Sequence, residues 1–297
     1  MSSTRRETRL GILMGVSAYT MWGVLPLFIR LLQSVTPPAI LSHRILWSLA
    51  ILMVLAFATK RWGAALKAIR NPRTALALGA STLFIACNWL LYIYAVNSGH
   101  ALQASLGYFI NPLVNVLLGL VFLRERLGKL ESVAIALAAA GVAVLTIEQG
   151  SIPWIPLALA FSFGSYGLIR KMIGLGPVEG LLVETGVLAP FALLWLLTQP
   201  NLATGAAAPA YWLLMASGVV TTAPLLLFAG AANRMRYSEL GLLQYIGPTL
   251  QMLIAINIFG EPLLPIYFAT FGLIWAGLVV YVFATWHRGR VTPVVPE

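Results

Sequence analysis

The residues of this chain that could do chemistry are a few charged side chains inside long apolar runs. Arg44 lies near the start of the apolar run 38–58, next to His43 and followed at helical spacing by Trp47. A guanidinium inside a membrane is costly and usually faces a cavity or a partner, so Arg44 is a candidate anchor for an anionic or carboxylate-bearing substrate. Two other interpretations stay open: a structural pair with an acid, and a position at the membrane surface.

Glu184 is the carboxylate that lies deepest in an apolar run. It falls in the first part of the run 179–198, with Thr185 beside it and Pro190 further along. A carboxyl group buried in a membrane can bind and release a proton, which suits proton or charge coupling. The alternative is a salt bridge to Arg44 that only holds two segments together. The sequence does not decide between these two roles.

Polar and aromatic side chains inside apolar runs indicate a pocket. Pro112 and Pro248 each break the hydrogen-bond ladder of a helix, which frees carbonyl groups, bends the helix and suits gating. Plain core packing is the alternative for each aromatic residue. The pocket residues predicted besides Arg44 are His43, Trp47, Asn88, Trp89, Tyr92, Tyr108, Asn111, Gln244 and Tyr245.

Absent motifs exclude several classes of protein. The chain contains no Asp and no Gly-x-x-x-x-Gly-Lys loop, which excludes phosphorylated-aspartate pumps, aspartyl intramembrane proteases and a P-loop motor. One cysteine, Cys87, and three scattered histidines make neither a disulfide framework nor a zinc site. We therefore expect no enzyme activity, no cofactor and no metal.

The composition is that of a membrane protein. Of the 297 residues, 60% are hydrophobic and 9% are charged, against roughly 25% charged in soluble proteins. The net charge of +10 does not indicate nucleic acid, because the basic residues fall in short gaps between apolar runs.

Ten segments are long and apolar enough to span a bilayer, which takes about 20 residues. An all-α polytopic fold with membrane lipids around it follows. The segments are 10–31, 38–58, 75–97, 101–123, 132–147, 153–169, 179–198, 210–232, 238–259 and 264–286.

Basic residues mark alternate gaps between these segments. Both termini and the gaps after the second, fourth, sixth and eighth segments carry Lys or Arg, and the intervening gaps carry none. This positive-inside pattern predicts that both termini are cytoplasmic. Only Arg30 and Arg44 are left without this explanation.

The second half of the chain repeats the first at an offset of 136 residues. Five spans in each half put the second half upside down relative to the first, with a substrate site near the midplane between the halves. We predict repeats over 10–147 and 148–286, flanked by a segment 1–9 and a tail 287–297. The matched pairs are Asn97 and Asn233, Ile110 and Ile246, Pro112 and Pro248, Glu125 and Glu261, and Gly141 and Gly277.

These residues resemble the RarD family of EamA-type permeases in the drug/metabolite transporter superfamily, over residues 8 to 288. The resemblance implies two inverted five-helix EamA repeats in the bacterial inner membrane, and export or exchange of small metabolites or drugs by secondary transport. RarD-like proteins carry names that refer to chloramphenicol, which leaves the substrate open. The motifs that carry the resemblance are His43-Arg44 with Trp47-Ser48, Asn88-Trp89, the run 105–112, the run 125–127, Glu184-Thr185 with Pro190, and Gln244-Tyr245 before Pro248.

The function expected is therefore secondary-active transport by alternating access. Arg44 would fix a negative group of a small-molecule substrate, and Glu184 would balance or relay charge. The alternatives are a passive channel or facilitator, an enzyme acting on lipid-linked substrates, and a non-transporting accessory protein. The small residues Gly272 and Ala276 suit either internal packing or a homodimer seam.

Overall fold

The structure is a computed structural model that describes residues 2–124, 128–198, 208–232, 234 and 243–291. This part of the chain forms eleven α-helices and no β-strand. The helices are α1 (Ser2–Arg30), α2 (Pro37–Ala58), α3 (Trp62–Arg70), α4 (Pro72–Asn97), α5 (Ala101–Phe122), α6 (Lys129–Gln149), α7 (Trp154–Ile173), α8 (Pro177–Thr198), α10 (Ala208–Ala232), α12 (Ile246–Asn257) and α13 (Pro265–Val291).

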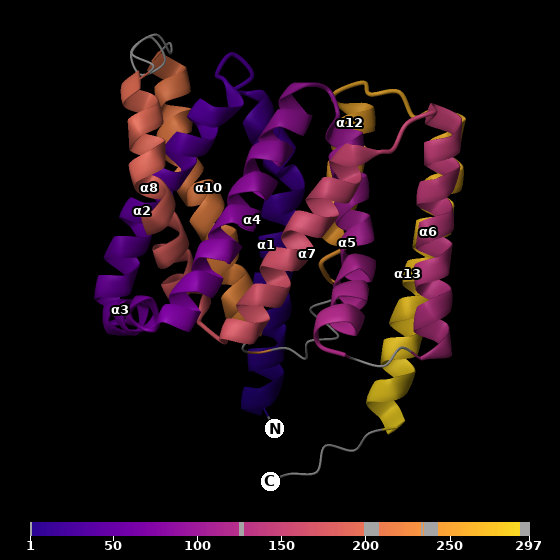
Figure 1. Cartoon of the computed structure of the whole chain (residues 1–297), viewed down its shortest axis with the longest axis horizontal. Helices are drawn as coiled ribbons and strands as arrows, with labels where there is room; N and C mark the ends of the chain where they lie inside the picture. The colour runs from indigo at the N-terminus through magenta and orange to yellow at the C-terminus, as the bar shows by residue number, and fades with distance from the viewer. Residues whose placement is uncertain (1, 125–127, 199–207, 233, 235–242, 292–297) are drawn as a thin grey trace.

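Eight of these helices are long and apolar enough to cross a membrane, by length and composition. Two more, α7 and α12, run alongside them and complete the ten that the sequence predicts (Figure 1). Part of the predicted segment 238–259 lies outside the described residues, and α12 covers its later part. The prediction of an all-α polytopic membrane protein is confirmed.

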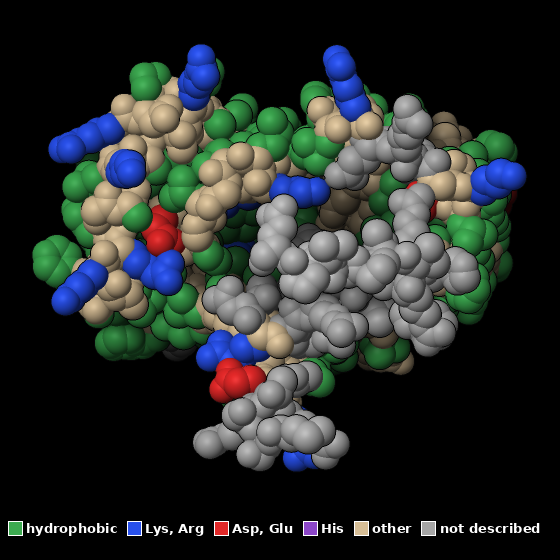
Figure 2. Space-filling view, turned by 90° about the horizontal axis from the view of Figure 1, so that it is seen from below, with side chains coloured by type: hydrophobic (Ala, Val, Ile, Leu, Met, Phe, Trp, Pro, Cys, Tyr) green, Lys and Arg blue, Asp and Glu red, His purple; other side chains and the backbone are tan. Residues whose placement is uncertain are grey.

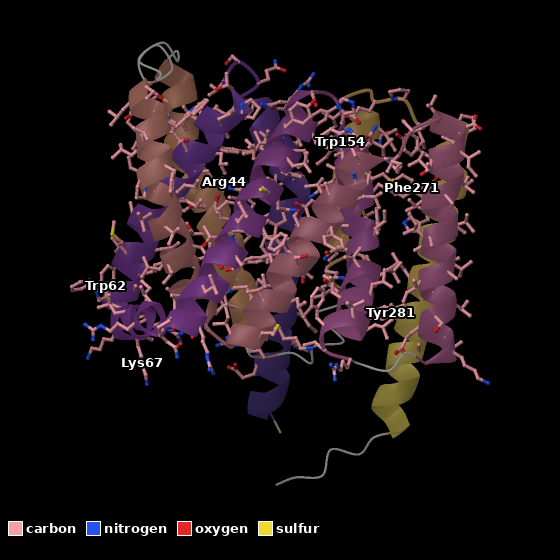
Figure 3. All side chains as sticks on the ribbon, in the orientation of Figure 1. Arg44, Trp62, Lys67, Trp154, Phe271 and Tyr281 are labelled. Carbon is pink, nitrogen blue, oxygen red and sulfur yellow. The ribbon has the colours of Figure 1, made fainter. Side chains whose placement is uncertain are left out.

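The helices run alternately up and down, so α1 begins and α13 ends at the same lower end of the molecule (Figure 1). The short helix α3 lies at that end too, where Trp62 and Lys67 project outward (Figure 3). In the sequence, α3 falls in one of the basic gaps between the predicted spans. It folds as a helix that buries Ala65 and Ala68 against the bundle and exposes its larger side chains.

Contacts between the two halves are symmetric. The pairs α6–α13, α2–α8 and α5–α12 are each formed by equivalent helices of the two halves. Most of the remaining contacts between the halves come in matched sets: α5–α7 with α12–α1, α4–α7 with α10–α1, and α2–α10 with α8–α4. A pseudo-two-fold axis that exchanges the halves produces this pattern. The exact repeat boundaries stay predictions.

The crossing of α6 and α13 shows the same symmetry in atomic detail. A Cβ built on Gly277 would lie 2.7 Å from the carbonyl oxygen of Ala134, and one built on Gly141 would lie 3.1 Å from that of Thr270. Ala134 and Thr270 are themselves 136 residues apart. Small residues let the backbones of membrane helices approach closely, so each glycine makes room for the other helix.

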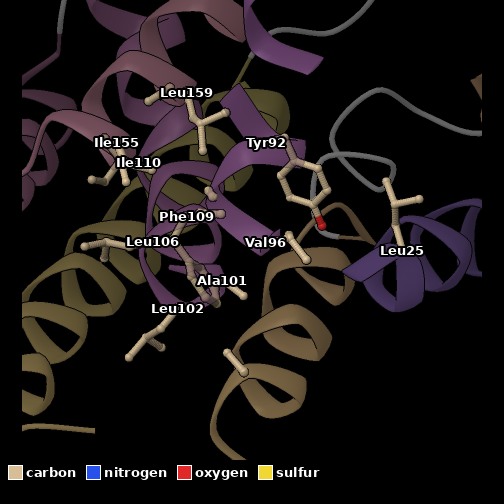
Figure 4. Close-up of a cluster of buried hydrophobic side chains, with 14 of the residues drawn as sticks. Leu25, Tyr92, Val96, Ala101, Leu102, Leu106, Phe109, Ile110, Ile155 and Leu159 are labelled. Carbon is tan, nitrogen blue, oxygen red and sulfur yellow. The ribbon is translucent and has the colours of Figure 1, made fainter. Parts of the chain in front are cut away.

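Helix α5 is the most enclosed of the candidate spans, with 61% of its apolar window buried. Its side chains Leu106, Phe109 and Ile110 lie in the main apolar cluster with Tyr92 of α4 and Leu25 of α1 (Figure 4). This cluster joins α1, α4 and α5, while Trp89 of α4 and Ile45 of α2 lie in a second apolar cluster with α8.

The α6–α13 crossing gives a test of the packing. Gly277→Ala should lower the free energy of unfolding by about 1–3 kcal/mol, because the new methyl group overlaps the backbone of α6. The measurement is the thermal unfolding midpoint of purified protein in detergent. Gly272→Ala is the matched control on the same helix, because a Cβ there meets no atom within 4 Å. Equal midpoints for the two variants would contradict the close crossing.

Candidate functional site

Arg44 lies between the two halves of the molecule. Its Nε donates a hydrogen bond of 2.6 Å to Thr221 Oγ1 on α10, and its guanidinium carbon lies 4.7 Å from the ring centroid of Trp89 on α4. The residue is 6% exposed. None of the ion pairs between described residues involves Arg44. The guanidinium is thus oriented by neutral groups from both halves.

The second hydrogen bond of the Thr221 hydroxyl leaves its oxygen free to accept a bond from Arg44. It donates a hydrogen bond of 2.8 Å to the carbonyl of Ser217, one helical turn earlier in α10. Threonine commonly bonds back to its own helix in this way. The proton is therefore used within α10, and the oxygen lone pairs face Arg44 as acceptors.

A small cavity adjoins Arg44 in the upper half of the molecule (Figure 3). The volume of the cavity is about 10 Å³, which is room for about one water molecule. Three residues give it polar groups, Arg44, Ser217 and Thr221, and the other walls are apolar. The apolar lining residues are Leu25, Phe28, Ile29, Ile40, Ile93 and Val220.

The lower face of the molecule is hollowed near its middle. Figure 2 shows hydrophobic side chains in the depth of this hollow and Lys and Arg side chains around the face. The Arg44 cavity lies toward the opposite end, away from Lys67 and Trp62 (Figure 3). Admission of a solute larger than water to Arg44 requires the surrounding helices to move apart.

Asn88 ties three helices together. Its Nδ2 donates to the carbonyl of Leu159 at 3.1 Å and to Ser162 Oγ at 3.0 Å, both on α7. Its Oδ1 accepts a bond of 3.2 Å from the hydroxyl of Tyr108 on α5. These bonds use both polar atoms of the amide, so the geometry gives Asn88 a structural part beside the site.

Tyr92 differs from Asn88 because its hydroxyl is free. The ring meets the ring of Tyr108 edge-on, with centroids 5.7 Å apart. The hydroxyl is buried and has no hydrogen-bond partner among the described residues. An unpaired buried hydroxyl costs free energy, so Tyr92 has a group to offer to a ligand.

Two further predicted residues lie beside Arg44 on α2. The His43 ring stands edge-on to the Tyr211 ring of α10, 6.4 Å between centroids. Trp47 packs closely on Gly218 of α10, where an added Cβ would lie 2.6 Å from the Trp47 Cβ. Both side chains therefore help to join α2 to α10.

Gln244 and Tyr245 form a separate group. They are adjacent in the chain, and the Tyr245 ring stacks on Phe109, with centroids 6.4 Å apart. Asn111 is buried on α5, and its Oδ1 has no partner among the described residues. These contacts connect Gln244 and Tyr245 to the core of α5, whereas Arg44 is contacted from α4 and α10.

The two predicted helix breaks differ in form. Pro112 lies inside the continuous helix α5. Pro248 lies in the first turn of α12, directly after a turn at Gln244 and Tyr245. Proline has no N–H, so Pro248 leaves the carbonyl of Gln244 without its usual helical donor. The predicted segment 238–259 is therefore interrupted directly before Pro248.

Glu184 is fully buried on α8 and is held by three partners. Ser81 Oγ on α4 donates to Oε1 at 2.7 Å, and the Tyr166 hydroxyl on α7 donates to Oε2 at 3.4 Å. The Nε of Arg170, also on α7, lies 3.9 Å from Oε1. The partner of Glu184 in this structure is thus Arg170, not Arg44.

Sequence reasoning took Arg170 as a topology signal at the end of a span and missed this pairing. Its side chain is 12% exposed and lies over Gly180, where there is no side chain to block it. Its Nη2 also donates to the carbonyl of Gly176 at 2.9 Å. Gly180, one helical turn before Glu184, is the feature of the sequence that could have indicated space for a long side chain beside Glu184.

Of the matched glutamates, Glu261 caps a helix. Its carboxylate accepts bonds from the backbone N–H groups of Ala101 and Leu102, at 2.7 and 2.8 Å. The favourable end of the helix dipole adds to these bonds. Glu261 therefore stabilises the start of α5, and its matched partner Glu125 lies outside the described residues.

Comparisons with known proteins agree with this architecture. Residues 9–147 match the family model described as EamA-like transporter family. An uncharacterized transporter of Vibrio cholerae is 44% identical over 285 residues, covering 95% of this chain and 94% of that protein. Protein RarD of Escherichia coli is 42% identical over 291 residues, 97% and 98% of the two chains.

More distant relatives extend the likeness. A chloramphenicol-sensitive protein RarD of Pseudomonas aeruginosa is 28% identical over 278 residues, 91% of this chain and 92% of that one. A solved crystal structure shares the fold, with a TM-score of 0.60 at 20% identity, over 91% of this chain and 96% of that chain.

The Glu184 contacts generate a double-mutant test. Arg170→Gln and Glu184→Gln should each destabilise the protein by about 3–5 kcal/mol, because each strands a buried partner. The double variant should recover much of this loss. Thermal unfolding of the purified proteins measures all three.

Arg234→Gln is the matched control for that cycle, because the Arg234–Glu7 pair is partly exposed and such pairs contribute about 0–1 kcal/mol. Additive losses in the double variant would mean that Arg170 and Glu184 do not interact.

Proposed function

The chain belongs to the EamA-like transporter family, in its RarD group, and we propose that it moves small metabolites or drugs by secondary-active transport with alternating access. It is a multi-pass membrane protein. The membrane proposed is the bacterial inner membrane, with the lower end in Figure 1 facing the cytoplasm, since the basic gaps of the sequence lie there.

One observation carries this proposal: a buried arginine without an acidic partner, between the halves of an inverted repeat. Arg44 on α2 is reached by α4 from its own half and by α10 from the other. Transporters with inverted repeats bind their substrates at the interface of the repeats. Arg44 is proposed to bind a negative group of the substrate there, with Trp89, Tyr92 and Thr221 around it.

Close packing around Arg44 favours a carrier over a channel. A channel needs a continuous aqueous path, whereas the described residues leave room for about one water beside Arg44. Pro112 and the break before Pro248 supply points at which α5 and α12 can bend. Counterflow would distinguish the two, because only a carrier lets an internal unlabelled pool drive uptake of label.

Glu184 is proposed to balance charge as one member of a pair with Arg170. The pair leaves two interpretations, a fixed strut between α7 and α8 or a site that opens when a proton binds. A name that refers to chloramphenicol belongs to a relative at 28% identity, so chloramphenicol is included among the compounds to test.

The test is thermal stabilisation of the purified protein by amino acids, organic acids, amines and chloramphenicol. A ligand of the folded state at a hundred times its dissociation constant should add about 2.7 kcal/mol to the free energy of unfolding. We expect an anionic compound to give this effect and Arg44→Ala to abolish it.

Arg30→Ala is the matched control, because Arg30 contacts the Phe259 ring at 5.2 Å and does not line the Arg44 cavity. It should keep the full stabilisation. A ligand that stabilises wild type and Arg44→Ala equally would move the substrate site away from Arg44. If none of the compounds stabilises the folded wild-type protein, the result counts against a substrate-binding carrier.

A further inference from the structure

Arg44 and Glu184 lie at similar distances from the start of two equivalent helices, although the offset of 136 residues itself pairs Arg44 with Gly180. Each lies seven residues after the first residue of its helix, Pro37 of α2 or Pro177 of α8, and α2 and α8 are exchanged by the pseudo-two-fold relation. Their polar neighbours correspond as well. Ser81 of α4 bonds to Glu184, and Ser217 of α10, 136 positions later, lines the cavity beside Arg44.

The two places differ in what the third helix supplies. At Glu184 this helix is α7, and it brings a counter-charge, Arg170. At Arg44 the equivalent helix is α1, and it brings only the apolar side chains of Leu25, Phe28 and Ile29. The cavity beside Arg44 is lined by α1, and α1 is the equivalent of α7, the helix that carries the counter-ion of Glu184.

The charges of the two sites do not cancel. Arg170 and Glu184 sum to zero, while the groups shown around Arg44 are the Thr221 hydroxyl, the Trp89 ring and apolar walls. A buried charge is tolerated when it is paired and is costly when it is not. Among the described side chains around it, none supplies the negative charge that Arg44 requires.

We infer that the substrate is an anion of single charge with an apolar body, that it supplies the counter-charge of Arg44, and that the carrier works as an exchanger. This rests on the proposed transport function. The negative group would lie against the guanidinium, and the body would face the walls formed by α1 and α4. The site is neutral when the anion is bound. Without the anion, Arg44 carries an unpaired charge, which must be closed off from water each time the carrier switches between its outward-open and inward-open states.

The inference predicts fast exchange and slow net transport. A central arginine in a membrane helix costs enough to slow the empty carrier roughly 100-fold relative to the loaded one. The probe is hexanesulfonate, which stays ionised and leaks little across lipid. Proteoliposomes that contain unlabelled hexanesulfonate should take up the labelled compound roughly 100-fold faster than anion-free proteoliposomes do. Clamping the membrane voltage should leave the exchange rate unchanged.

Two comparison probes share the same apolar body and differ only in charge. Hexanedisulfonate has two negative charges, and hexyltrimethylammonium has one positive charge. Neither should exchange. If either exchanges while hexanesulfonate does not, the single-charge assignment is wrong. Equal uptake of hexanesulfonate with and without an internal pool would overturn exchange and leave the transport function standing.

A fixed counter-ion provides the second test. Thr221→Asp places a carboxylate beside Arg44, so it should abolish both stabilisation and exchange by hexanesulfonate without lowering thermal stability. Thr221→Asn, which has the size of Asp but no charge, should weaken both only in part, so the difference between the two variants measures the effect of the added charge. Retention of exchange in Thr221→Asp would refute the role of Arg44.

Failure of the inference and failure of the function are distinguishable. A stabilising ligand in the metabolite panel with no sulfonate exchange contradicts only the inference. If no compound of the panel stabilises the protein and no sulfonate is exchanged, the proposed function itself is contradicted.

Discussion

A guanidinium buried in the hydrocarbon layer without a carboxylate is the constraint on which the site depends. Arg44 cannot be deprotonated under ordinary conditions, so its charge must be met by neighbouring dipoles or by a ligand. Thr221 directs its lone pairs at Nε because its own proton is used within α10. Trp89 places the negative face of its ring under the guanidinium. These groups orient the charge and leave it uncompensated.

Two other buried polar groups in the same bundle have their partners within the protein. The amide nitrogen and oxygen of Asn88 are both hydrogen-bonded, to α7 and α5 respectively. The carboxylate of Glu184 is contacted by Ser81, Tyr166 and Arg170. Such groups join helices that apolar contacts alone hold together weakly in lipid. The contrast separates polar residues that build the bundle from those that face a ligand, which a list of polar residues in apolar runs cannot do.

The sequence predicts what is local or periodic. Apolar length gives the ten spans, the constant offset gives the duplication, and the charge of Arg44 stands out in its run. It does not predict partners across helices, such as Ser81 and Glu184, which are 103 residues apart. Arg170 was misjudged because residues at span ends usually mark topology, whereas its long side chain reaches back over Gly180. Helix α3 was missed because a short basic amphipathic segment also suits a connection.

The inverted repeat connects the difference between Arg44, which has no counter-ion, and Glu184, which has one, to the way the carrier would change conformation. Alternating access in such a fold amounts to each half taking the packing of the other. The helices around Glu184, α4, α7 and α8, are closed on a neutral pair in this structure. In the opposite state the equivalent helices around Arg44, α10, α1 and α2, would close in their turn. They can do so at little electrostatic cost only when a negative group lies in the cavity beside Arg44. In the proposed mechanism, the charge that binds the substrate would thereby also couple closure to binding.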